Sequence, residues 1–264
     1  MSLSFCAASH AGVRRPSNQD SHCARPDLGL FAVADGVGGH AAGEVASRAV
    51  LDAIEEAVAD TRGRGASERW PFEFQAPLGV DGNRLNWAVH LANLRVRAEM
   101  RAAPGRAGMA TTVAAVLLEN DGRGPRDPVG SATIAHVGDS RIYRLRAGRI
   151  DRLTRDHSWV QDQVSAGLIS EGEARRHPRR NLLTRAMSGG ADPVVDIGWV
   201  PLAAGDRLIL CTDGLSGVIA EEEMARMAGE EFGAASGATV CDGLVHAANL
   251  AGGPDNVTVI VVRL

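Results

Sequence analysis

Three strongly apolar runs of this sequence end in an aspartate beside a small residue. They are FAVADG (31–36), IAHVGDS (134–140) and LILCTDG (208–214). A fourth aspartate, Asp255, lies just before the apolar run NVTVIVV, and a fifth, Asp20, lies in RRPSNQDS. Such runs predict buried strands, and buried carboxylates repel one another unless a cation neutralises them. The joint pattern therefore favours a cation site over a set of independent turns.

Oxygen ligands of this kind suit a hard divalent cation, and the neighbouring glycine carbonyls can also reach it. No His-His or Cys-His spacing competes, so Mn²⁺ or Mg²⁺ is favoured over zinc. Taken singly, Asp139, Asp213 and Asp255 are more typical of turns or caps. Two ions that share a carboxylate can activate water and neutralise a phosphate. The residues therefore predict a two-metal phosphoester hydrolase.

Arg15 stands five residues before Asp20 among polar neighbours. Its guanidinium fork matches a phosphate dianion. A solvated surface charge is the alternative interpretation of a single arginine, and both remain open from the residues alone.

The periodicities predict an α+β layered fold rather than a regular βαβ alternation. Amphipathic helices are predicted over 41–60 and 83–103, and 221–251 reads as mostly helical. Strands are predicted over 29–35, 111–119, 131–139, 141–145, 206–214 and 255–264. The range 61–82 reads as a surface loop, and 155–190 as a polar segment with short helical pieces.

Length and composition bound the class of protein. The 264 residues, 45% apolar, suit one large domain or two small ones. A net charge of −4 without a basic stripe argues against nucleic-acid binding. No signal peptide or bilayer-spanning run is visible, which predicts a soluble, intracellular protein. The four scattered cysteines are expected to be buried or incidental thiols in a reducing cytosol, without a disulfide or zinc framework.

A set of motifs in order along the chain resembles the metal-dependent serine/threonine protein phosphatases of type 2C, in their compact bacterial form. The motifs are RPSNQD (15–20), VADGVGGHAAGEVAS (33–47), GMATTVAAVL (108–117), AHVGDSRIYRL (135–145), LTRDHSWVQDQVSAGLIS (153–170), LLTRAMSG (182–189), LILCTDGLSG (208–217) and GGPDNVTVIVV (252–262). One such motif alone would be weak, but the ordered set spans nearly the whole chain.

This resemblance implies a four-layer αββα sandwich, in which two antiparallel sheets are flanked by helices. It implies one catalytic domain over 1–264, with a flap within about 155–190. It also implies hydrolysis of phosphoserine and phosphothreonine in proteins without a phosphoenzyme. Two Mn²⁺ or Mg²⁺ ions would take part, with a third, weaker site.

The resemblance assigns roles by position. Asp35 would bridge two metals, and the Gly36 carbonyl would bind the second of them. Asp213 and Asp255 would hold the first, Asp20 would act through water, and Asp139 with Asp213 would form the third site. Arg15 would bind the substrate phosphate.

One position departs from the pattern of many eukaryotic members. Val37 occupies the place where they carry a histidine as candidate general acid, and His40 follows the glycines instead. His40 could protonate the leaving oxygen, because histidine titrates near neutral pH. Capping of the helix that begins at Ala41, or a loop contact, is an equal alternative.

The implied partners are phosphorylated proteins and a cognate bacterial serine/threonine kinase, with no nucleic acid and no membrane. The expected state is a cytoplasmic monomer. Three rivals remain: a phosphatase with one dedicated regulatory substrate, a pseudophosphatase that binds phosphoproteins, and a hydrolase of small phosphoesters. Trp70, Phe72 and Phe74 in the 61–82 loop form either a local cluster or a docking patch for partners.

Overall fold

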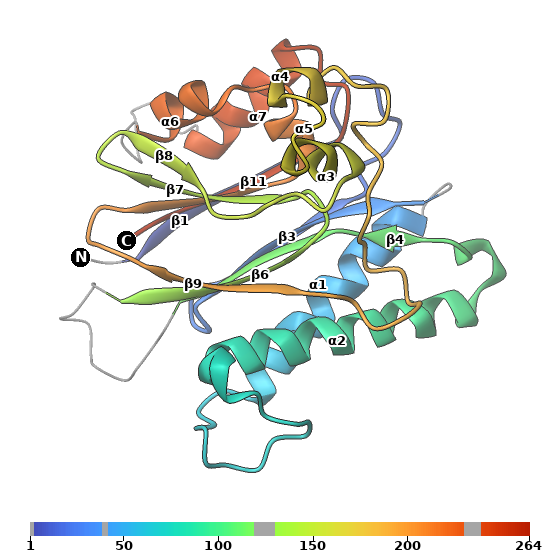
Figure 1. The fold of residues 1–264 in the computed structure, drawn as a ribbon, viewed down its shortest axis with the longest axis vertical. Coiled ribbons are helices and arrows are strands. Elements are labelled where there is room, and N and C mark those ends of the chain that lie inside the picture. Colours follow the sequence, from blue (N-terminus) through green and yellow to red (C-terminus); the bar gives the residue numbers. More distant parts are fainter. Residues whose placement is uncertain (1–2, 39–41, 119–129, 230–238) are drawn as a thin grey trace.

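Two antiparallel sheets pack face to face at the centre of the computed structural model, which describes residues 3–38, 42–118, 130–229 and 239–264 (Figure 1). The first sheet has the strand order β1-β11-β10-β7-β8, and the second has β2-β3-β5-β6-β9, with β4 paired to β3. The strands are β1 (Ser4–His10), β2 (Asp20–Arg25), β3 (Leu30–Val37), β4 (Ala110–Thr111), β5 (Val113–Leu118), β6 (Ser131–Val137), β7 (Arg141–Arg146), β8 (Arg149–Arg152), β9 (Asp196–Pro201), β10 (Arg207–Cys211) and β11 (Val257–Arg263).

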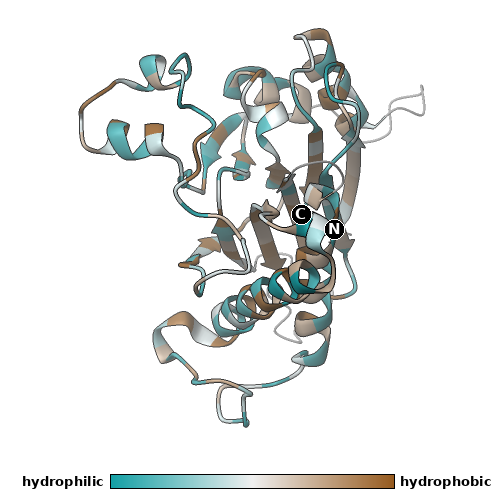
Figure 2. Cartoon of the chain, turned by 90° about the vertical axis from the view of Figure 1, so that its right-hand side faces the viewer, coloured by the Kyte–Doolittle hydropathy of each residue, from teal (hydrophilic) through white to brown (hydrophobic). Residues whose placement is uncertain are grey.

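Alternation along the central strands divides the apolar side chains between two layers. In β3, Phe31 and Val33 point into the space between the sheets, whereas Leu30 and Ala32 face the helices. In β10, Leu208 and Leu210 likewise face the other sheet. Because successive strand residues point to opposite faces, a run that is apolar throughout must be covered on both sides. The central strands are accordingly mostly brown in Figure 2.

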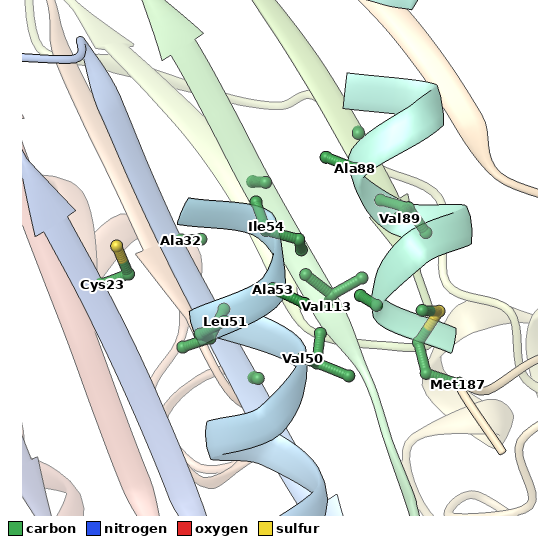
Figure 3. Close-up of a cluster of buried hydrophobic side chains, with 14 of the residues drawn as sticks. Cys23, Ala32, Val50, Leu51, Ala53, Ile54, Ala88, Val89, Val113 and Met187 are labelled. Atoms are coloured by element: carbon green, nitrogen blue, oxygen red, sulfur yellow. The ribbon is translucent and has the colours of Figure 1, made fainter. Parts of the chain in front are cut away.

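Two long helices cover the outer face of the second sheet: α1 (Ala42–Asp60) and α2 (Gly79–Ala102). Val50 and Ile54 of α1 and Val89 of α2 are fully buried against Val113 of β5 (Figure 3). Each buried aliphatic side chain of this size contributes roughly 1.5–3 kcal/mol to folding.

Helices near the C-terminus cover the first sheet: α5 (Asp213–Ser216), α6 (Glu221–Gly229) and α7 (Val240–Leu250). Two short helices, α3 (Trp159–Ser165) and α4 (Glu171–Ala174), lie in the segment after β8. Short 3₁₀ turns η1 (Ala76–Leu78) and η2 (Pro104–Arg106) flank α2. The predicted α+β sandwich, with two antiparallel sheets between layers of helices, is confirmed.

Element boundaries differ from the sequence prediction in places. Helix α2 begins at Gly79 rather than at residue 83, because Asn83 fixes its first turn: its side chain donates to the carbonyls of Gln75 and Gly79. The strand predicted over 206–214 ends at Cys211, and Asp213 instead opens α5. Strands β1, β2, β8 and β9 were not predicted, since they carry more polar side chains.

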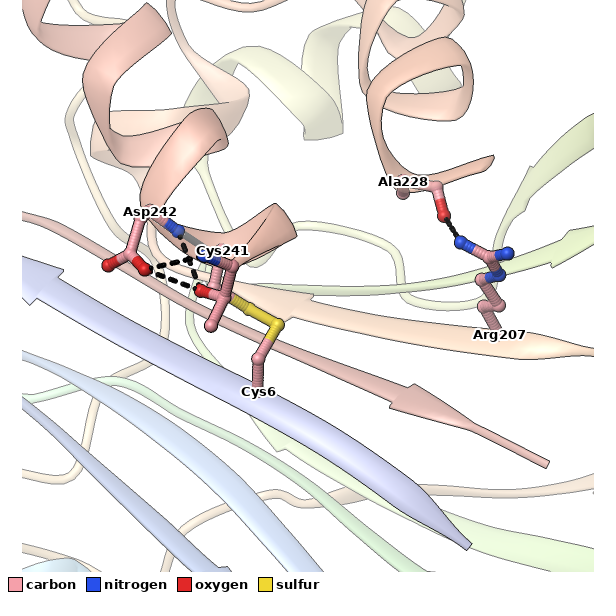
Figure 4. The surroundings of a disulfide bond; sticks show 6 residues. Cys6, Arg207, Ala228, Cys241 and Asp242 are labelled. Atoms are coloured by element: carbon pink, nitrogen blue, oxygen red, sulfur yellow. Dashed lines mark hydrogen bonds between the residues drawn. A yellow bond between two sulfur atoms is a disulfide. The ribbon is translucent and has the colours of Figure 1, made fainter. Parts of the chain in front are cut away.

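A disulfide joins Cys6 of β1 to Cys241 of α7, so the expectation of four thiols is wrong (Figure 4). The two Cα atoms lie 6.0 Å apart, within the usual range for a disulfide. The residues are separated by 235 positions, and only the packing of α7 on β1 brings them together. Cys23 and Cys211 are buried free thiols, as predicted.

The aromatic residues of the 61–82 loop form a local cluster. Trp70 lies 5.3 Å from Phe72 and 5.7 Å from Phe74, measured between ring centroids. Phe72 also stacks on Trp87 of α2 at 4.8 Å. The cluster anchors the loop on the helix that follows it.

Candidate metal centre

Five aspartates predicted as metal residues come from five different segments near the ends of strands. Asp20 opens β2 and lies directly opposite Asp35 of β3 in the antiparallel register. Asp139 lies in the turn between β6 and β7, Asp213 opens α5, and Asp255 stands two residues before β11. The pKa of each of Asp20, Asp35 and Asp213 is affected by charges of other members, so these carboxylates lie within electrostatic range of one another.

Two oxygens of this group are buried and have no hydrogen-bond partner among the described residues. They are Oδ1 of Asp20 and Oδ1 of Asp213. Asp20 is only 7% exposed, and its other oxygen accepts a hydrogen bond from Thr212 Oγ1 at 2.8 Å. Buried polar atoms of folded proteins almost always have a hydrogen-bond partner. These two unpaired oxygens therefore indicate that they bind a ligand, such as a cation.

The electrostatics of the group disfavour the charged form of Asp20, Asp35, Asp139 and Asp213. Burial, with the charges of Asp213 and Asp255, raises the pKa of Asp20 to about 7, although hydrogen bonds from Thr258 and Thr212 oppose the rise. Burial, with the charges of Asp213 and Asp156, raises the pKa of Asp139 to about 8. Burial and the neighbouring aspartates raise the pKa of Asp35 well above its ordinary value.

A divalent cation would remove this cost, because it stabilises the deprotonated carboxylates. The donor set consists of carboxylate oxygens from separate segments, which is the chemistry that Mg²⁺ and Mn²⁺ prefer. The residues present therefore fit such ions.

Gly36 lies in a position that only glycine can occupy. A Cβ atom built on Gly36 would lie 2.1 Å from the carbonyl oxygen of Gly43 and 2.5 Å from that of Gln19. The first turn of α1 therefore packs directly against the backbone that follows Asp35. This contact gives the physical reason for the glycine after the signature aspartate.

Two threonines fix the backbone of Asp35. Thr111 Oγ1 donates to the Asp35 carbonyl at 2.8 Å, and the Asp35 amide donates to Thr112 Oγ1 at 3.0 Å. Thr112 Oγ1 also shares a 2.7 Å hydrogen bond with Ser140 Oγ, next to Asp139. Asp35 and the Asp139 turn are thus linked through one buried hydroxyl. The β-branched sequence of 111–112 predicted only strand residues here, and the hydroxyl pairing was missed.

Arg15 lies beside one of these carboxylates, Asp255. Its Nη2 donates to Asp255 Oδ2 at 2.7 Å, and its side chain is 53% exposed. The segment that carries it is held by Asn256, which the sequence analysis missed. The Asn256 side chain accepts from the Gln19 amide and donates to the carbonyls of Ala11 and Ser17, each at 2.8 Å. A polar amide just before a strongly apolar strand was the available signal.

Arg141 and Asp156 join the Asp139 turn to the segment that follows β8. Arg141 Nε and Nη2 donate to the two carboxylate oxygens of Asp156 at 2.9 and 2.7 Å. A cavity of about 470 Å³ opens beside them, and its lining includes Asp139, Asp213 and Arg175. The 155–190 segment therefore walls the space next to the metal centre.

One predicted site residue, His40, lies outside the described residues. Val37, at the position of the histidine of many eukaryotic members, is 51% exposed. In the described part of the chain, no helix is long and apolar enough to cross a bilayer.

Comparison with known proteins identifies relatives over nearly the whole chain. The family model for protein phosphatase 2C matches residues 8–247. The serine/threonine protein phosphatase PstP of Mycobacterium tuberculosis is 35% identical over 260 residues, which cover 98% of this chain but 44% of PstP. The chain thus spans less than half the length of that relative. The serine/threonine phosphatase stp of Listeria monocytogenes is 34% identical over 234 residues, covering 89% of this chain and 84% of stp.

Solved structures agree with this relationship. A crystal structure of the M. tuberculosis phosphatase PstP/Ppp has a TM-score of 0.79 and 34% identity, covering 99% of this chain and 98% of that one. The catalytic domain of PstP in complex with two manganese ions has a TM-score of 0.76 and 32% identity, with 99% and 97% coverage. Together with the aspartate cluster, these matches show that the chain belongs to the protein phosphatase 2C family.

Proposed function

We propose that this protein hydrolyses phosphoserine and phosphothreonine in other proteins, using water and divalent cations held by its aspartates. The observation that carries the proposal is the pair of buried, unpartnered oxygens on Asp20 and Asp213 within a group of mutually repelling carboxylates. Family membership supports the reaction class, and the PstP structure with two manganese ions supports the choice of metal.

The aspartates would divide the ions among them. Asp35 would bridge two ions, and the Gly36 carbonyl would complete the site of the second. Asp213 and Asp255 would hold the first, while Asp20 would act through water. Asp139 with Asp213 would form a third, weaker site. When bound, the ions would supply a water of lowered pKa and neutralise charge on the phosphate.

Arg15 would bind the substrate phosphate. Its half-exposed guanidinium already pairs with Asp255 at the metal centre. A phosphate bound there would therefore lie within reach of the two-pronged hydrogen-bond donor of this arginine. His40 remains the candidate proton donor to the leaving oxygen, by its position in the sequence. These roles place phosphate binding on one arginine and metal binding on the aspartates, whose ions would neutralise the phosphate charge.

The wider setting is part of the same proposal. The substrates would be phosphorylated proteins, with a cognate serine/threonine kinase as the opposing enzyme. Residues 1–264 would act as one catalytic domain and as a cytoplasmic monomer, with 155–190 as the flap. The Cys6–Cys241 disulfide bears directly on the cellular compartment, because disulfides are rare in a reducing cytosol.

Release of phosphate from a phosphothreonine peptide tests the proposal. Wild type should turn over with Mn²⁺ and stop with EDTA, and Asp213→Asn should be inactive with Mn²⁺. A folded, Mn²⁺-loaded wild type that cleaves none of several phosphopeptides would favour the alternative, a phosphoprotein-binding pseudophosphatase. Cleavage of p-nitrophenyl phosphate alone would instead indicate a hydrolase of small phosphoesters.

A further inference from the structure

A second group of ionisable side chains lies beside the metal centre and has no role in the proposed reaction. His136 of β6 and His157 are buried, and their rings stack at 4.5 Å between centroids. Asp196 opens β9 opposite His136 in the register of the sheet. Ligand atoms of these three residues lie within 4.8 Å of one another, a spacing that suits a metal ion.

The hydrogen bonds of the group argue against a metal ion there. His136 Nε2 bonds the Arg155 carbonyl at 2.8 Å. The Arg185 guanidinium already stands in the group, with Nη1 at 2.8 Å from Asp196 Oδ1 and 3.2 Å from His157 Nε2. A second cation would have to displace this arginine.

The two nitrogens of the His157 ring have different partners. Nδ1 accepts the amide hydrogen of Gly138 at 3.1 Å, so the proton of the neutral ring must be on Nε2. Nε2 faces Asp196 Oδ2 at 3.2 Å, where it can donate. With the proton on Nε2, the 3.2 Å approach of Arg185 Nη1 is a contact between two donors and not a hydrogen bond. Asp196 therefore selects the tautomer in which Nδ1 is free to accept, as carboxylates do for other functional histidines.

Gly138 is held on three sides. The backbone amide of His157 donates to the Gly138 carbonyl at 2.9 Å, while its ring accepts from the Gly138 amide. Gly138 has a φ of 108°, and a Cβ there would lie 2.5 Å from Thr112 Cγ2. Both polar backbone groups before Asp139 are thus fixed by one histidine at the start of the 155–190 segment.

We infer that His157 is a positioning residue for Asp139, and that Asp196 acts through it by fixing the ring's tautomer. The inference rests on the proposed function, in which Asp139 contributes to the third, weakest metal site. Without the ring acceptor, the Gly138 amide would be buried and unpaired, and the Asp139 turn would lose its defined place.

Amide hydrogen exchange tests the contact without metal. In the metal-free protein, His157→Phe should speed exchange of the Gly138 amide by about 10-fold or more, because the ring shape stays but the acceptor is lost. His157→Asn should keep exchange within about 3-fold of wild type, because its Oδ1 can accept the same hydrogen. Equal exchange in wild type and His157→Phe, or equally fast exchange in both variants, overturns the inference.

Mn²⁺ binding by calorimetry then tests the consequence. His157→Phe should weaken the weakest Mn²⁺ site by about 10-fold and leave the tighter sites within about 2-fold, whereas His157→Asn should resemble wild type. Asp196→Ala should act in the same direction, and it serves if His157→Phe does not fold, since its side chain is 48% exposed. His177→Asn is the matched control, because that histidine of the 155–190 segment contacts the Trp159 ring instead, at 4.9 Å between centroids.

Asp139→Asn separates the two proposals. If it abolishes the weakest site and His157→Phe has no further effect in that background, the histidine acts through Asp139. If Asp139→Asn removes that site but His157→Phe leaves it intact in the wild-type background, the positioning inference fails alone. If Asp139→Asn leaves every Mn²⁺ site unchanged, the proposed metal role of Asp139 fails, while the exchange experiment still decides whether His157 holds Gly138.

Discussion

Arg15 Nη2 donates to Asp255 Oδ2 at 2.7 Å across a separation of 240 residues. The pair joins the loop after β1 to the loop before β11, two strands that are neighbours in the first sheet. Its side chains are 53% and 25% exposed, so the contact is accessible to ligands. A cation bound at Asp255 and a phosphate bound at Arg15 would each draw one partner away from the other.

The Arg15–Asp255 pair predicts opposite effects of one substitution on two ligands. Arg15→Met should lower kcat/KM for phosphopeptides by about 10–100-fold, the loss of one charge-assisted hydrogen bond or two. The same change should leave Mn²⁺ binding as tight as in wild type or tighter, because Asp255 loses its competing cation. Arg15→Lys should fall between, since an ammonium cannot make the two-point contact. Parallel loss of Mn²⁺ affinity and activity would contradict this division of roles.

Asp213→Asn should separate stability from activity. Burial and the charge of Asp255 raise the pKa of Asp213, so removing its charge relieves repulsion in the metal-free protein. The variant should therefore melt at a higher temperature without metal and lose most of the shift that Mn²⁺ produces in wild type. Turnover should fall by about 100-fold or more. Substitution of a residue that only hydrogen-bonds to a metal ligand already lowers activity by about 10–100-fold, and Asp213 is proposed as a direct ligand.

The control for that experiment is Asp60→Asn, a change at the exposed end of α1. It should leave the metal-free melting temperature, the Mn²⁺ shift and turnover within error of wild type. A lower metal-free stability of Asp213→Asn would mean that its charged form is well paired in the fold, against the repulsion described above.

The raised pKa values predict how metal-free stability depends on pH. Asp20 has a pKa of about 7 and Asp139 of about 8, against about 3.9 in an unfolded chain. Between pH 4 and 8 these two carboxylates thus bind more protons in the folded protein than in the unfolded one, so their contribution to stability falls as pH rises through this window. The metal-free melting temperature should be higher at pH 5.5 than at pH 8.0.

Mg²⁺ should reverse this trend. Metal binding displaces protons from the same carboxylates, so the stabilisation by a fixed Mg²⁺ concentration should be larger at pH 8.0 than at pH 5.5. Asp20→Asn should flatten the metal-free pH dependence. A metal-free protein that is more stable at pH 8.0 would show that these carboxylates are not protonated in the fold.

Sequence patterns predicted the buried parts of this fold well. The apolar runs of β3, β10 and β11 give strands because both of their faces are covered, and the four-residue spacing of α1 gives a helix. The edge strand β1 has a mixed pattern of buried and exposed residues, so its sequence carries no such signal. The Asp-small motifs pointed to Asp35, Asp139 and Asp213, and the apolar run after Asp255 pointed to that residue; their assignment as metal ligands stays a prediction.

What the sequence did not predict depends on contacts between distant segments. Asn256, Thr112 and His157 are ordinary polar residues until the fold places an amide or carbonyl beside each of them. The pairing of Cys6 with Cys241 likewise has no local spacing to reveal it. Such pairs are set by the tertiary structure. The sequence shows the two residues of each pair but not that they are in contact.

The Cys6–Cys241 disulfide predicts a stability that depends on reductant. It closes a loop of 235 residues, so its loss should cost about 2–5 kcal/mol of unfolding free energy through the greater freedom of the unfolded chain. For a chain of this size that corresponds to a fall in melting temperature of roughly 5–15 °C. Turnover at 25 °C should persist, because neither cysteine is among the proposed metal or phosphate ligands.

Thermal melts with and without dithiothreitol measure the effect. Alkylation of thiols in cells lysed under denaturing conditions, which expose the buried Cys23 and Cys211, shows whether the bond forms there. Cys23→Ser should keep the response to reductant, whereas Cys6→Ser should melt at the lower temperature under both conditions. A wild type that melts at the same temperature with and without reductant, and that alkylates at all four cysteines in cells, would place this protein in a reducing compartment as a dithiol. A protected pair in cells would instead place it in an oxidising one, against the proposed cytoplasmic location.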